Sequence, residues 1–85
     1  MIDTANIQVA ITMTDDDFIG IAKQGEAGPA VSVVEVGNGW AIYGPSGVYK
    51  DSSGQRIFDL AKVHSFIAGW GIKRFVQGKV VLAMP

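Results

Sequence analysis

The sequence predicts an α+β fold, with an antiparallel β-sheet of about four to five strands packed against one main amphipathic helix at residues 59–70. Two observations lead to this expectation. Short β-rich runs alternate with glycine-containing turns over residues 30–57, and residues 59–70 carry apolar side chains at helical spacing. A chain of 85 residues that is 48% hydrophobic and 18% charged suits one compact domain, residues 1–85.

The N-terminal third predicts one strand and one short helix. Residues 6–13 alternate apolar and polar side chains, as a strand packed on one face does. Thr14 then precedes an acidic run at residues 15–17, and a threonine followed by carboxylates is typical of a helix start. We therefore expect a short helix at residues 15–23. A glycine inside that segment weakens a helix, so a strand at residues 18–23 is the competing interpretation.

The middle of the chain predicts a meander of short antiparallel strands. Residues 30–36 and 40–43 are β-rich and are joined through Gly37-Asn38-Gly39, which tolerates the positive φ angles of a hairpin turn. A second glycine-rich turn follows. A third connection at residues 51–54 is expected to join one more strand pair, whose second strand is residues 55–57.

The C-terminal third contains the clearest helix. Asp59 stands at the start of the apolar stripe at residues 59–70, and Gly71 stands just past its end, where a left-handed cap is favoured. A strand at residues 72–76 follows. A tight turn or a bulge then leads to a final apolar run at residues 80–83.

The charges are sorted between the two halves of the chain. Residues 1–44 hold six acidic residues against one lysine, whereas residues 45–85 hold six basic residues against two acidic ones. The net charge of −1 hides this separation. Separated charge indicates which surfaces attract which partners. A total so close to zero argues against strong non-specific binding to DNA.

The acidic half supplies the first candidate binding surface. Asp15, Asp16 and Asp17 suit a contact with a basic protein surface, although helix capping alone also explains them. Glu26 adds a further carboxylate. Trp40, beside a turn, is expected to be partly exposed and is the candidate anchor of the interface. These five residues are the predicted protein-binding set.

The basic half supplies an alternative surface made of Lys73, Arg74 and Lys79. Aromatic residues lie among these cations in the sequence, and exposed aromatics among basic groups bind single-stranded nucleic acid. The aromatic residues concerned are Trp40, Tyr43, Tyr49 and Phe75. Lysines that guard a sheet edge are the structural interpretation of the same pattern, and an acidic protein partner is the third.

The sequence lacks the patterns of catalytic and metal sites. It contains no cysteine, and its one histidine, His64, has no evident acid–base partner. We expect His64 to be a surface or half-buried structural residue. The serines lack a nucleophile-elbow motif. We therefore expect a non-enzymatic protein that uses no cofactor and no metal.

Location and assembly follow from the same composition. The start of the chain does not have the pattern of a signal peptide, and no apolar run reaches the length of a membrane span. We expect a cytoplasmic protein without membrane contact. The apolar content favours a surface that is covered, either in a homodimer or by a partner protein.

Residues 55–76, with the sequence QRIFDLAKVHSFIAGWGIKRFV, resemble the C-terminal part of small proteins encoded by phages, plasmids and integrative elements. In those proteins a hairpin leads into Phe-x-Leu, one amphipathic helix, a Gly-Ile turn and a last strand. Several anti-CRISPR proteins share this layout. The resemblance covers about a quarter of the chain and implies a non-enzymatic inhibitor. Its partner would be a nucleic-acid-handling defence complex, such as a CRISPR effector subunit, whose target site it blocks. A small nucleic-acid-binding or plasmid-maintenance regulator is the alternative function.

Overall fold

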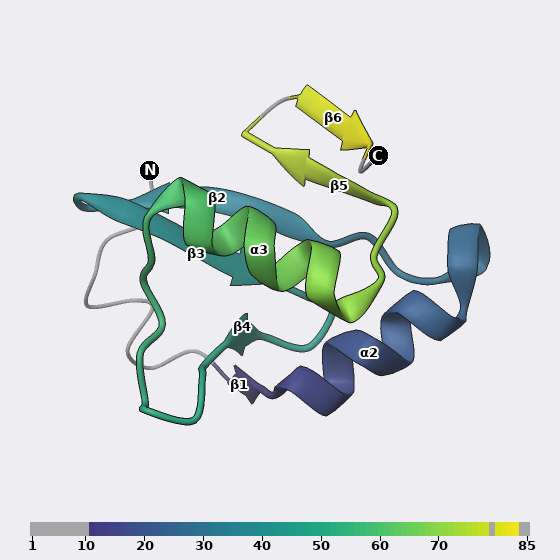
Figure 1. Cartoon of the computed structure of the whole chain (residues 1–85), viewed down its shortest axis with the longest axis horizontal. Helices are drawn as coiled ribbons and strands as arrows, with labels where there is room; N and C mark the ends of the chain where they lie inside the picture. The colour runs from purple at the N-terminus through teal and green to yellow at the C-terminus, as the bar shows by residue number, and fades with distance from the viewer. Residues whose placement is uncertain (1–10, 79, 84–85) are drawn as a thin grey trace.

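Six strands form one mixed sheet in the spatial order β1-β4-β3-β2-β5-β6 in the computed structural model (Figure 1). The structure describes residues 11–78 and 80–83, without the side chains of Glu26 and of residues 80–83. The strands are β1 (Thr12–Met13), β2 (Ser32–Val36), β3 (Gly39–Tyr43), β4 (Val48–Tyr49), β5 (Arg74–Gln77) and β6 (Val80–Ala83). The helices are α2 (Asp15–Lys23), the short 3-10 helix η1 (Gly25–Ala27) and α3 (Leu60–Trp70).

The predicted α+β class is confirmed, but the sheet is mixed and not purely antiparallel. Strand β1 runs parallel to β4, and β2 runs parallel to β5. The other strand pairs, β2–β3, β3–β4 and β5–β6, are antiparallel. Each parallel pair arises because a helix carries the chain back along the sheet, so the next strand points the same way as the one before the helix. Two such crossovers, through α2 and α3, flank the predicted β2-β3-β4 meander.

Strand β1 lies against β4 because Gly47 carries no side chain. The N–H group of Val48 donates to the carbonyl oxygen of Ile11 at 2.8 Å. A Cβ atom on Gly47 would collide with that same carbonyl oxygen. Glycine at this position of the predicted turn therefore has a packing role.

The expected strand at residues 55–57 does not form. After β4 the carboxylate of Asp51 accepts hydrogen bonds from the N–H groups of Ser53 and Gln55, at 3.0 and 2.8 Å. The backbone N–H groups of this turn therefore bond to a side chain and not to a neighbouring strand. The chain then makes a single bridge in which Phe58 and Trp40 exchange backbone hydrogen bonds of 2.8 and 2.9 Å. One bridge replaces the predicted strand pair.

Both predicted helices are present, and their ends match the sequence signals. The N–H and hydroxyl groups of Thr14 donate to the carboxylate of Asp17, at 2.8 and 3.2 Å, which closes the first turn of α2. Asp59 caps α3 by accepting from the N–H of Lys62 at 2.8 Å. Gly71 ends α3 with a φ of 86°, the left-handed conformation that glycine favours.

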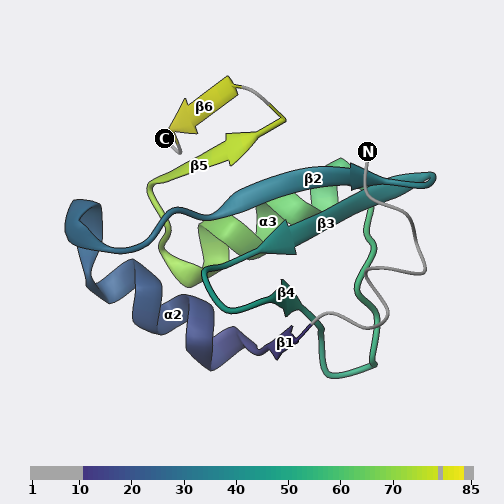
Figure 2. The same cartoon turned by 180° about the vertical axis from the view of Figure 1, so that it is seen from behind.

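Helix α3 lies across one face of β2 and β3, and α2 lies near the C-terminal end of α3 (Figures 1 and 2). Buried side chains from both helices and from the sheet form the main core. Its centre is aromatic: the Phe18 ring of α2 stacks on Trp70 of α3, with 4.5 Å between the ring centroids. Tyr49 of β4 meets the Trp70 ring edge-on at 4.8 Å. Such pairs stabilise the fold beyond the area that they bury, so this cluster joins α2, α3 and β4.

Candidate functional site

Asp15, the first residue of the predicted acidic surface, accepts two hydrogen bonds from core residues. One of its carboxylate oxygens accepts the hydroxyl of Tyr49 at 2.9 Å and the indole N–H of Trp70 at 2.7 Å. Tyr49 is 1% exposed and Trp70 is 7% exposed, so both donors would otherwise be buried without an acceptor. The Asp15 side chain therefore links the start of α2 to β4 and to the end of α3. Trp70 is a core residue, as the apolar stripe predicts.

The other two aspartates of the acidic turn differ in role: Asp17 caps the helix, and Asp16 lies on the surface. Asp17 closes the helix cap with Thr14. All three aspartates are exposed, and Asp16 lies between the two whose carboxylates accept hydrogen bonds within the fold. In its place on the first turn of α2, Asp16 is the member of the trio best placed to meet a partner.

The structure does not bring the five predicted protein-binding residues together. Glu26 lies on η1, beyond the far end of α2, and nine helical residues span about 13 Å. Trp40 pairs with Phe58, just before the start of α3, whereas Asp15 bonds to Trp70, the last residue of α3. Trp40 is half-buried against the main core, consistent with the expected partial exposure. The predicted surface is therefore divided among three places.

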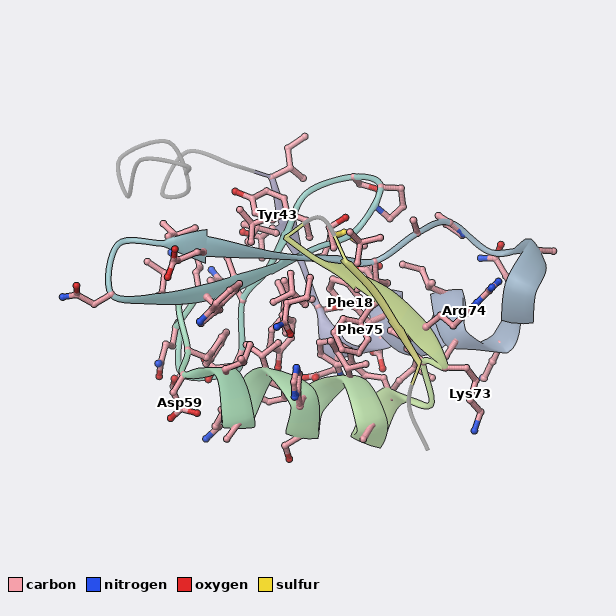
Figure 3. All side chains as sticks on the ribbon, turned by 90° about the horizontal axis from the view of Figure 1, so that it is seen from above. Phe18, Tyr43, Asp59, Lys73, Arg74 and Phe75 are labelled. Atoms are coloured by element: carbon pink, nitrogen blue, oxygen red, sulfur yellow. The ribbon has the colours of Figure 1, made fainter. Side chains whose placement is uncertain are left out.

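The basic surface differs from its prediction in its aromatic part. Lys73 and Arg74 are exposed at the start of β5, and Lys79 lies outside the described residues. Phe75 is only 3% exposed, and Figure 3 shows its ring between β5 and α3. Tyr49 is likewise buried in the aromatic core. These two rings therefore do not meet the exposure that the nucleic-acid alternative needs, whereas Trp40 and Tyr43 are half-buried.

A cavity of about 360 Å³ lies between the C-terminal end of α2, the loop that follows it and the start of β5. No local pattern in the sequence indicates this cavity, because its lining residues come from two segments far apart in the chain. The described residues that line it are Ile21, Ala22, Gly25, Gly28, Pro29, Ala30, Val31, Ile72, Lys73, Arg74, Phe75 and Val76. Lys73 and Arg74 are the charged members of that set, and Figure 3 shows them extending outward at this end of the molecule. The cavity thus combines apolar walls with a cationic rim.

His64 has a structural environment, as predicted. Its Nε2 atom lies 2.7 Å from the side-chain oxygen of Gln77 on β5, and its ring lies 5.4 Å from that of Phe75. The residue is half-buried on α3. Its hydrogen bond attaches α3 to the strand that carries the cationic rim.

The phenol of Tyr49 makes stability depend on pH in the alkaline range. Burial raises its pKa above the usual value of 10.0, and the hydrogen bond to Asp15, the charge of Asp15 and the charge of Asp51 raise it further. An unfolded chain loses this proton near pH 10, whereas the folded protein keeps it. Stability is therefore intact below pH 10 and falls above it, by at most ~1.4 kcal/mol per pH unit.

Tyr49→Phe is expected to remove this part of the alkaline loss. Urea denaturation of both proteins at pH 8, 9, 10 and 11 measures this loss. Lysine titration affects both proteins alike, so the difference between their free energies of unfolding reports on Tyr49. The free-energy gap between wild type and variant should narrow above pH 10. A gap that stays constant from pH 8 to pH 11 contradicts the prediction.

Among residues 11–78 and 80–83, no three side chains of His, Cys, Asp or Glu gather in a way that could hold a metal ion. No helix within this part has the length and apolar character needed to cross a membrane.

No protein-family model, curated protein or solved structure matches this chain.

Proposed function

We propose that this chain is a non-enzymatic protein-binding module. The observation that carries the proposal is the cavity of about 360 Å³ at the end of α2, with apolar walls and with Lys73 and Arg74 on its rim. An apolar centre surrounded by charged groups is the composition of protein interfaces. The volume also lies in the range of pockets that bind ligands.

Three polar groups that could support chemistry are used by the fold instead. Asp15 holds Tyr49 and Trp70, and Asp59 caps α3. His64 is bonded to Gln77. These contacts give each group a structural role, which supports binding as the function of the molecule.

Charge would guide the partner to this surface. The acidic first turn of α2 and the cationic rim lie near opposite ends of the same helix, because Asp16 begins it and the cavity is lined by Ile21 and Ala22 near its end. A partner with complementary charges would meet both signs in one orientation. Complementarity of this kind raises the association rate and sets the orientation more than it adds affinity.

The part of the anti-CRISPR layout that remains in this fold, one amphipathic helix followed by a Gly-Ile turn and a strand, supports a class of partner. We propose a cytoplasmic inhibitor, encoded by a mobile genetic element, that occupies the target site of a nucleic-acid-handling defence complex. Such complexes present lysine and arginine tracks to DNA or RNA, and the exposed carboxylate of Asp16 suits a contact with such a track.

Affinity purification from the native host, followed by titration of the purified partner, tests the proposal. Asp16→Asn is expected to slow association by about two- to fivefold at low salt, with the effect shrinking at 0.5 M salt. Glu35→Gln is the matched control, since Glu35 is an exposed carboxylate on β2 and the charge change is the same. A partner that binds both variants like the wild type removes the acidic turn from the interface. Failure to recover any partner contradicts the proposed function.

Binding of nucleic acid is the second candidate, because Lys73 and Arg74 are adjacent and exposed. Two cations contact few phosphates, and the buried rings of Tyr49 and Phe75 are not available for stacking with bases. Fluorescence anisotropy with labelled 20-nucleotide single-stranded DNA is expected to show no saturable binding at 50 mM salt. Saturable binding that weakens tenfold or more at 200 mM salt, and that is lost in Lys73→Glu, would favour the nucleic-acid function instead.

A further inference from the structure

We infer that the cavity between α2 and β5 binds a short acidic and apolar segment of a partner protein. One aliphatic or aromatic side chain of that segment enters the cavity, and a neighbouring carboxylate lies against Lys73 and Arg74. The inference rests on the proposed protein-binding function and adds the chemistry of the segment that is recognised.

The walls of the cavity favour an apolar group. Four of the lining side chains, Ile21, Val31, Ile72 and Phe75, are at most 7% exposed and belong to the main core. These four side chains form the floor of the cavity and pack against the main core. A volume of about 360 Å³ lies within the range of pockets that bind small ligands, enough for one large side chain. Burying such a side chain supplies the hydrophobic part of the binding energy.

Small residues form the opposite side of the cavity and let a peptide backbone come close. Gly25 has a φ of 63°, which favours glycine there. A Cβ atom on Gly28 would lie 3.0 Å from both the Cβ atom of Gln24 and the carbonyl oxygen of Ile21. Backbone geometry therefore keeps this side of the cavity free of large side chains.

The rim selects for negative charge. Lys73 and Arg74 are the charged residues among the described lining set, and Lys23, in the last turn of α2, is an exposed cation on the same helix end. A guanidinium group has five N–H donors, so Arg74 can take a carboxylate in addition to other contacts. A segment that carries Asp or Glu beside its apolar residue satisfies both the walls and the rim.

Other ligands match only part of this site. A nucleic acid brings phosphates, but its bases carry polar edges that the apolar walls would leave without hydrogen-bond partners. An uncharged apolar segment makes no use of the positive charges of Lys73 and Arg74. The pairing of an apolar side chain with a carboxylate on one short peptide uses every feature of the cavity.

NMR titration of the ¹⁵N-labelled full chain tests the inference with defined probes. The probes are capped tetrapeptides Gly-Φ-Asp-Gly in which Φ is Leu, Ile, Phe or Met. At least one should shift the amide signals of residues 21–31 and 72–76 in a saturable way. The matched peptide with Lys in place of Asp should bind at least tenfold more weakly, and so should the peptide with Ala in place of Φ. Sodium hexanoate, a small apolar acid without a peptide backbone, is titrated as the control ligand.

Two variants separate charge from shape. Lys73→Glu should weaken the best peptide at least fivefold, and Ala30→Trp should weaken it by blocking the cavity at an exposed lining position. Lys62→Glu is the control, because it makes the same charge change near the other end of α3. Equal weakening by Lys62→Glu and Lys73→Glu overturns the inference, since net charge alone would then explain the result.

The remaining outcomes separate this inference from the proposed function. If no peptide shifts these signals, or if hexanoate binds at least as tightly as every peptide, the inference is overturned. Capture of a host partner that Lys73→Glu and Ala30→Trp leave unchanged refutes the inference and keeps the proposed function. Peptide binding at the cavity without any captured partner supports the inference and counts against the function.

Discussion

Replacing Asp15 with alanine is expected to lower the free energy of unfolding by about 2–5 kcal/mol. The substitution removes the acceptor of the Tyr49 hydroxyl and of the Trp70 indole N–H, and both donors are buried. A buried donor that loses its partner costs about 1–3 kcal/mol. Urea denaturation followed by tryptophan fluorescence measures the change, and circular dichroism confirms that the variant still folds.

Two substitutions at and beside this position show whether the hydrogen bonds are the cause. Asp15→Asn keeps an oxygen that can accept both hydrogens but loses the negative charge, so about 1–2 kcal/mol is expected. Asp16→Ala changes the next residue, which is exposed, and should cost less than about 1 kcal/mol through the helix dipole. If Asp15→Ala costs no more than Asp16→Ala, the two bonds do not contribute to stability and Asp15 returns to the set of surface contacts.

This result determines how binding experiments on the acidic turn are designed. A change of all three aspartates would alter the partner contact and the packing of α2 together. The change at Asp16 alone keeps the bonds of Asp15 and the cap made by Asp17. Asp16 is therefore the position at which binding can be tested without a loss of fold.

The helices were predictable because their signals are local. Thr14 and the acidic residues after it indicate the start of α2, and Asp59 and Gly71 indicate the ends of α3. The order of the strands was not predictable in the same way. Whether β1 pairs with β4, and β2 with β5, depends on where two helices return the chain, and no short pattern records that. The sequence therefore predicts the fold class and the meander but not the parallel pairs.

The candidate site shows the same limit. Lys73 and Arg74 were identified from their charge, but the cavity beside them needs residues 21–31 and 72–76 to meet in space. The burial of Phe75 has no clear local signal. Successive residues of a strand point to opposite faces, so the predicted strand at residues 72–76 places Phe75 on one face with Lys73. Its burial follows only once β5 is known to begin at Arg74.

Replacing Phe18 with alanine is expected to lower the free energy of unfolding by about 3–5 kcal/mol, the usual cost of removing a buried phenylalanine ring. Phe18 is fully buried, and its ring stacks on Trp70 at 4.5 Å and meets Tyr49 edge-on at 5.8 Å. For 85 residues the total stability is roughly 4–13 kcal/mol, so the variant loses a large part of it. Urea denaturation at pH 7 measures the loss.

The same change should also weaken peptide binding, because α2 supplies Ile21 and Ala22 to the cavity wall. Phe18→Leu is the matched control. It keeps most of the apolar volume and loses the ring contacts, so about 1.5 kcal/mol is expected, with peptide affinity within about twofold of wild type. A loss below about 1 kcal/mol in Phe18→Ala would mean that α2 is not anchored by this ring. A large loss of stability with unchanged peptide affinity in the remaining folded protein would mean that the cavity does not depend on the packing of α2.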